Sequence, residues 1–128
     1  MNTIQTSVFV LTAHKKEIES LREALEARGD KYLGAGVKLE SGQTEEELAY
    51  AVVAPSQIPK DVATSALLEL AQTFGRSYIT EIDERNRRLY LHTEAGEECL
   101  GRYSESFQKE EPQERFVAVE DRYLILGH

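Results

Sequence analysis

The residues of this chain best suited to chemistry are its three histidines and its single cysteine. His14, His92 and His128 fall in none of the spacings typical of a metal site. A lone cysteine, Cys99, excludes both an internal disulfide and a cysteine-rich zinc site. From the sequence we therefore expect no metal ion and no cofactor.

Catalytic signatures are missing as well. Glu97 and Glu98 precede Cys99 and disfavour the thiolate that a nucleophile requires, so we expect this thiol to be buried and structural. His92-Thr93-Glu94 is one His-x-Thr-like tripeptide, without the second copy that a paired-histidine hydrolase needs. The glycines are isolated and form no phosphate-binding loop. We expect a protein that is not an enzyme.

One stretch is basic and aromatic against an acidic background. Strand alternation places Leu89 and Leu91 on one face and Arg88, Tyr90 and His92 on the other. Arginine and tyrosine are enriched at interfaces, and arginine binds a phosphate or carboxylate with two hydrogen bonds. The candidate binding site therefore consists of Arg76, Arg88, Tyr90 and His92.

The same arginines have a purely structural alternative, which is ion pairing across a hairpin. The carboxylates available to them there are those of Glu81, Asp83 and Glu84. The sequence leaves both interpretations open.

The charge balance excludes one class of function. Twenty-three acidic against fifteen basic residues give a formal net charge of −8. A generic nucleic-acid binder needs a basic surface, so we expect none. An acidic surface keeps a protein in solution or, less often, attracts a basic partner. The single cysteine favours a reducing, cytoplasmic location, and no run approaches the roughly 20 apolar residues of a membrane helix.

Hydrophobic periodicity predicts the elements that must position these residues. Two amphipathic helices are expected, one over residues 14–28 and one from Pro59 to Gly75. A strand at 7–12 precedes the first helix, and a hairpin over 31–54, turning at Ser41-Gly42, separates the two. Further strands are expected within 77–83, 87–93, 99–103, 116–119 and 123–126, with a loop over 104–114.

This order predicts one α+β domain over residues 1–128. Two helices would pack on one face of a mainly antiparallel sheet, with a ferredoxin-like β-α-β-β-α-β start followed by C-terminal β-hairpins. The last hairpin is apolar on both faces, since Phe116 and Ala118 alternate with Val117 and Val119. Either the chain itself or a second subunit must cover it, and we expect a homo-oligomer.

Three short motifs resemble a family. They are Thr12-Ala13 after the first strand, Glu47-Leu48-Ala49-Tyr50 in the third, and Phe74-Gly75-Arg76 at the end of the second helix. Over residues 8–82 the chain is similar to a bacterial and phage domain of unknown function, number thirty-two ninety-three. The resemblance implies a small accessory protein of bacterial or phage origin, and it implies no activity.

The functional expectation follows from these exclusions. We expect a non-catalytic, acidic binding protein with a protein partner, of the accessory or inhibitor type that phages use against host defence. The alternative is a protein that binds or sequesters a nucleotide-like anion at Arg76, Arg88, Tyr90 and His92. Neither alternative involves a membrane.

Overall fold

The computed structural model describes residues 7–40 and 42–127. Ten elements follow one another along the chain, much as the periodicity predicts, although Ser41 of the expected turn lies outside the described residues. Their bounds are β1 Ser7–Thr12, α1 Ile18–Arg28, β2 Lys31–Lys38, β3 Glu47–Ala54, α2 Lys60–Thr73, β4 Ile79–Asp83, β5 Arg88–Thr93, β6 Gly96–Ser106, β7 Phe116–Val119 and β8 Arg122–Leu126.

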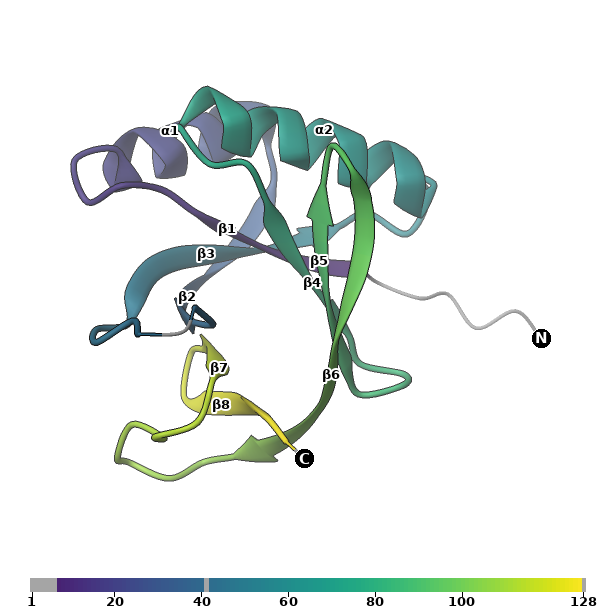
Figure 1. Ribbon diagram of the computed structural model, residues 1–128. Helices are drawn as coiled ribbons and strands as arrows, with labels where there is room; N and C mark the ends of the chain where they lie inside the picture. Colours follow the sequence, from purple (N-terminus) through teal and green to yellow (C-terminus); the bar gives the residue numbers. More distant parts are fainter. Residues whose placement is uncertain (1–6, 41, 128) are drawn as a thin grey trace.

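The eight strands form a closed antiparallel barrel (Figure 1). The order around it is β1-β3-β2-β7-β8-β6-β5-β4, and β4 pairs with β1 to complete the circle. The predicted α+β fold, a ferredoxin-like sheet with open edges and helices on one face, is therefore wrong. β2 and β4, where that open sheet would end, each receive another strand, β7 and β5.

Closure depends on β6, whose eleven residues serve two partners. Its first part pairs with β5 up to Arg102, and its last four residues, Tyr103–Ser106, pair with β8. The register shifts by one residue opposite Leu89/Tyr90, and Gly101 has φ 129°, a value that side-chain-bearing residues rarely adopt. A bulge of this kind bends a strand sharply. The strand can thus leave one part of the sheet and join the other.

Two apolar clusters lie on opposite faces of the sheet, because successive side chains of a strand point to opposite sides. One fills the barrel and includes Val10, Ile82, Leu89 and Leu124. The other lies between the outer face of β1, β3 and β4 and the two helices; its members include Phe9, Leu11, Val52, Ile79, Leu21, Leu25, Leu67 and Ala71.

Both helices cover one side of the barrel (Figure 1). α1 buries Ile18, Leu21 and Leu25 and ends at Gly29, which has the left-handed φ of 76° that glycine tolerates. The helix begins at Ile18 rather than at residue 14, because the amide of Glu17 bonds to the carbonyl of His14 in a separate turn.

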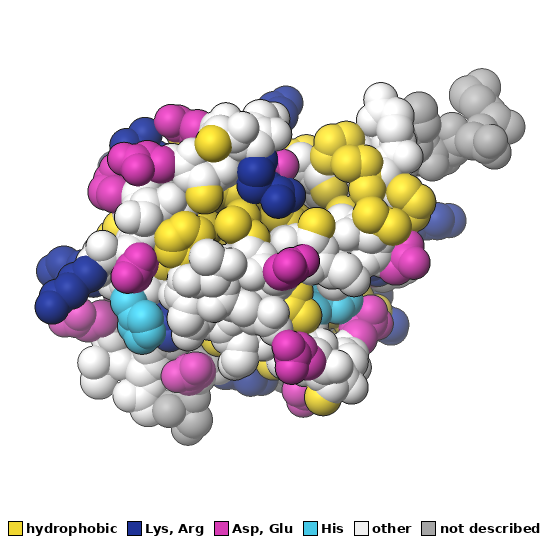
Figure 2. Space-filling view, turned by 90° about the horizontal axis from the view of Figure 1, so that it is seen from above, with side chains coloured by type: hydrophobic (Ala, Val, Ile, Leu, Met, Phe, Trp, Pro, Cys, Tyr) yellow, Lys and Arg dark blue, Asp and Glu magenta, His cyan; other side chains and the backbone are white. Residues whose placement is uncertain are grey.

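α2 presents small side chains, Ala63 and Ala71, with Leu67 between them, so it lies close to the strands. Viewed from the helix side, a band of hydrophobic side chains runs across this face (Figure 2). Near the start of α2, Ile58 and Val62 are exposed.

The first strand of the C-terminal hairpin is covered by its own chain. All four residues of β7 are buried, and Phe116, on the outer face, packs edge-to-face on Tyr123 with 5.0 Å between ring centroids. On β8, Leu124 and Leu126 are buried, whereas Tyr123 and Ile125 on the outer face are half-buried. The two-sided apolar pattern of β7 therefore needs no second subunit, and the homo-oligomer stays a prediction. Among the described residues, no helix combines the length and apolar character needed to cross a membrane.

Candidate functional site

A groove of about 600 Å³ lies between the first half of α2 and the turn that joins β5 to β6. The helix contributes Lys60, Asp61 and Thr64 to its walls, and the strands contribute His92 and Glu97. Its volume is within the range of small-ligand sites. A binding group would meet polar side chains there.

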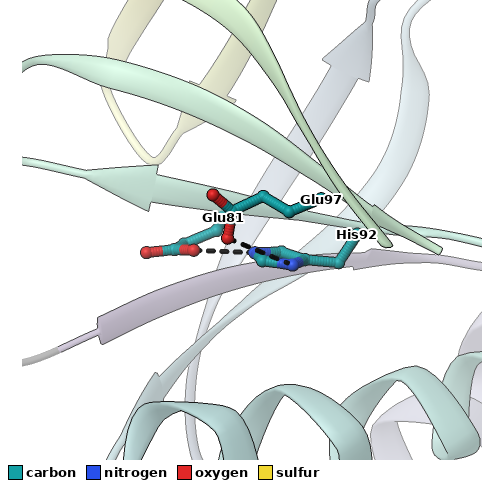
Figure 3. A group of neighbouring side chains, drawn as sticks. All are labelled: Glu81, His92 and Glu97. Atoms are coloured by element: carbon teal, nitrogen blue, oxygen red, sulfur yellow. Dashed lines mark hydrogen bonds and ion pairs between the residues drawn. The ribbon is translucent and has the colours of Figure 1, made fainter. Parts of the chain in front are cut away.

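Two of the lining residues, Lys60 and His92, contact a buried carboxylate outside the lining, that of Glu81. β4 pairs with β1 so that Glu81 lies opposite Phe9, on the sheet face that the helices cover. Its side chain is only 4% exposed, and both of its oxygens have partners. Oε1 lies 2.7 Å from Nε2 of His92 (Figure 3). Oε2 lies 2.9 Å from Nζ of Lys60.

These two partners determine the charge of Glu81. Burial by itself would raise the pKa of this carboxyl, but the hydrogen bonds from His92 and Lys60 outweigh it and hold the pKa below its ordinary value. An ionised carboxylate only accepts hydrogen bonds. Nε2 of His92 therefore carries the proton of the short bond to Glu81.

His92 and Glu97 come from neighbouring strands and lie directly opposite each other in the β5–β6 register. Nδ1 of His92 lies 3.9 Å from Oε2 of Glu97 (Figure 3). The imidazole is nearly buried, with 8% of its side chain exposed, whereas half of the Glu97 side chain is exposed. The histidine is thus fixed, and the glutamate is free to rotate toward a ligand.

Lys60 connects the groove to the sheet surface. Its ammonium lies 5.8 Å from the ring centroid of Tyr90, a cation–π distance. Burial lowers the pKa of Lys60, but Glu81 more than compensates, and the net shift is upward. The lysine therefore stays charged and paired with Glu81.

The four predicted site residues do not converge. His92 lines the groove and Tyr90 lies beside Lys60, but Arg88 lies at the other end of β5, opposite Asp83. Arg76 follows the C-terminal end of α2 and pairs with Glu47 of β3. His92 is buried instead of lying on an exposed stripe.

The structural alternative, in which the arginines pair with carboxylates across the hairpin, differs from the ion pairs that the structure shows. Glu81 pairs with Lys60 and His92 and with no arginine. Glu84 does pair with an arginine, but with Arg122 from β8, 3.1 Å away. Hairpin neighbours in the sequence are therefore not the partners.

Sequence reasoning missed Glu81, Lys60 and Glu97 as site residues. The available signal was Glu81, an acid that shares its strand parity with the fully buried Ile79. Cys99, expected to be buried, is exposed; this part of β6 pairs with β5 on one side, and β8 pairs only with the later residues Tyr103–Ser106. His128 lies outside the described residues.

Comparisons with protein-family models, with curated proteins and with solved structures found no match to this chain. The family resemblance therefore depends on the three short motifs alone. Nothing in these comparisons supports the expected phage origin or an inhibitor of host defence, and we withdraw both.

Proposed function

We propose that this chain is a non-catalytic binding protein that accepts a basic side chain of a protein partner in the groove between α2 and the β5–β6 turn. The observation that carries the proposal is the charge of the groove. The groove is lined by one lysine, Lys60, and by the carboxylates of Asp61 and Glu97, and Lys60 is paired with Glu81 outside the lining. Since Lys60 is paired with Glu81, Asp61 and Glu97 remain to attract a cation.

The rest of the surface supports the same class of partner. A net charge of −8 speeds the approach of a basic protein through long-range attraction. The same negative charge disfavours the nucleotide-like anion of the alternative. In addition, Arg76, one of the residues expected to bind that anion, is already paired with Glu47. The hydroxyl of Thr64 and the apolar side chain of Leu68 add adaptable contacts within the groove.

The hydrogen bonding of His92 supports a role without catalysis. Among the described residues, its only hydrogen-bond partner is Glu81, and no serine, threonine or cysteine side chain is bonded to it. A nucleophile needs a base within hydrogen-bond reach. We further propose a cytoplasmic location, on the grounds of the single, exposed Cys99.

Matched charge reversals test the proposal. Glu97→Lys changes the groove, whereas Glu98→Lys makes the same change in charge on the next residue of β6, which points to the other face. Each purified variant and the wild type would be used to capture proteins from a lysate of the cells that encode the chain.

We expect a protein that the wild type and Glu98→Lys retain and that Glu97→Lys loses by at least tenfold. Equal retention by both variants would show that the general acidic surface does the binding. That result would overturn the proposal.

A further inference from the structure

We propose that Glu81, His92 and Glu97 form a binding site for a divalent transition-metal ion, with zinc as the best fit. This inference goes beyond the partner proposed above, because it concerns a metal ion held by two lining residues of the groove and by the buried Glu81 beside them. The three residues come from adjacent strands, β4, β5 and β6, and share the face that α2 covers. One donor atom from each lies within 4.8 Å of the other two.

The donor set selects the type of metal. An imidazole nitrogen and two carboxylate oxygens suit zinc and its neighbours in the first transition series, whereas magnesium and calcium prefer oxygen alone. Two carboxylates neutralise a divalent charge. Three protein ligands leave at least one position open toward the groove for water or for a donor from a bound molecule.

Two of the three donors are already held in place. The side chains of Glu81 and His92 are 4% and 8% exposed, and strand pairing fixes both. Their contact of 2.7 Å is a hydrogen bond, and an ion with bonds of about 2.1 Å requires these atoms to move apart by well under 1 Å. The ion takes the place of the Nε2 proton, and solvent exchange moves that proton to Nδ1, so the imidazole binds the ion in its neutral form.

The third donor closes the site from outside. Glu97 is half exposed and offers an oxygen within 4.8 Å of the donors of Glu81 and His92, so rotation of its side chain brings its carboxylate to the ion (Figure 3). Binding thus combines a rigid pair with one mobile ligand. Lys60 stays paired with Oε2 of Glu81, where its positive charge lowers the affinity for the metal ion without blocking Oε1.

The position of Lys60 predicts the direction in which its substitution should change metal affinity. Lys60→Met removes the competing charge while keeping the length of the side chain, so it should raise the affinity for the metal ion at least threefold. Glu97→Gln should weaken it at least tenfold without unfolding the protein, because this side chain lies at the surface. Glu98→Gln is the matched control and should leave affinity unchanged.

The experiment is calorimetric titration of the untagged protein with zinc chloride, repeated with cobalt(II) while its visible spectrum is recorded. We expect one ion per chain, a cobalt spectrum typical of a nitrogen- and oxygen-ligated site, and affinities in the order Lys60→Met, wild type, Glu97→Gln. No binding at 1 mM metal would overturn the inference. Equal losses in Glu97→Gln and Glu98→Gln would overturn it too, because they would indicate diffuse binding to an acidic surface.

The outcome is separable from that of the proposed function. Failure of metal binding leaves the capture experiment unaffected, and a partner that binds in the presence of a chelator supports the groove without the ion.

Discussion

A basic residue near each end of α2 pairs with a glutamate of the sheet, and the two pairs behave differently. Near its start, Glu81 is bound by Lys60 and His92 under an open groove. Beyond its end, Glu47 pairs with Arg76, its one ion-pair partner in the part of the chain that the structure describes. The pKa of Glu81 is lowered despite burial, whereas burial raises the pKa of Glu47 more than Arg76 lowers it.

The number of partners explains the difference. Glu81 accepts from two donors, which together exceed the cost of its desolvation. Glu47 has one donor and also feels the negative charge of Glu40. The Glu47 pair joins the segment after α2 to β3, whereas Glu81 holds an imidazole and an ammonium that line a groove. The first arrangement serves the fold, and we infer that the second serves binding.

Removing each carboxylate should give the largest difference in stability between the two sites. Glu81→Ala leaves a nearly buried His92 without its acceptor, and we expect a loss of about 3 kcal/mol in the free energy of unfolding. Glu47→Ala removes a less buried partner, with an expected loss of about 1 kcal/mol. Urea denaturation measures both. Equal losses would show that the two pairs contribute alike.

The pH dependence of stability should have opposite signs at the two sites. The folded pKa of Glu81 is lowered, so its contribution is complete above the ordinary glutamate pKa of about 4.3 and is lost as the pH falls through the folded value. The folded pKa of Glu47 is raised, so its contribution is complete below about pH 4.3 and declines as the pH rises through the folded value.

Denaturation of Glu81→Gln and Glu47→Gln from pH 3 to pH 7 checks this pair of signs. The stability of Glu81→Gln should rise less steeply with pH than that of the wild type. The stability of Glu47→Gln should fall less steeply with pH than that of the wild type. The same slope change in both variants would contradict the assignment.

Glu97→Gln should have the smallest effect on stability. Its carboxylate is half exposed, and its contact with His92 is 3.9 Å long, so we expect a change within about 0.5 kcal/mol. A loss above about 1 kcal/mol in thermal or urea unfolding would place Glu97 among the structural residues and remove it from the binding groups.

Local patterns in the sequence predicted most of the elements but not their closure into a barrel. Strand and helix periods are local, so β1, β7 and α2 occur close to where they were expected. Closure depends on β6 continuing through Gly101 to Ser106, in a polar stretch whose last residues were interpreted as a loop. Its partner β8 lies far along the chain, and no local pattern records that pairing.

The site was predictable only in part, for a similar reason. Strand parity correctly separated Tyr90 and His92 from Leu89, which enters the barrel. Arg76 and Arg88 were grouped with them by closeness in sequence, yet they lie at opposite ends of the β4–β5 region. Lys60 reaches Glu81 only through the packing of α2 on the barrel, which the sequence does not specify locally.

The most direct test of the account is nuclear magnetic resonance of the protein titrated with argininamide, a probe for a partner's basic side chain. We predict amide shifts concentrated at Thr64, Leu68, Thr93 and Gly96, which line the groove, and abolished by Glu97→Lys. Shifts centred on Glu47 and Arg76, or spread evenly over the acidic surface, would contradict the claim that the groove is the binding site.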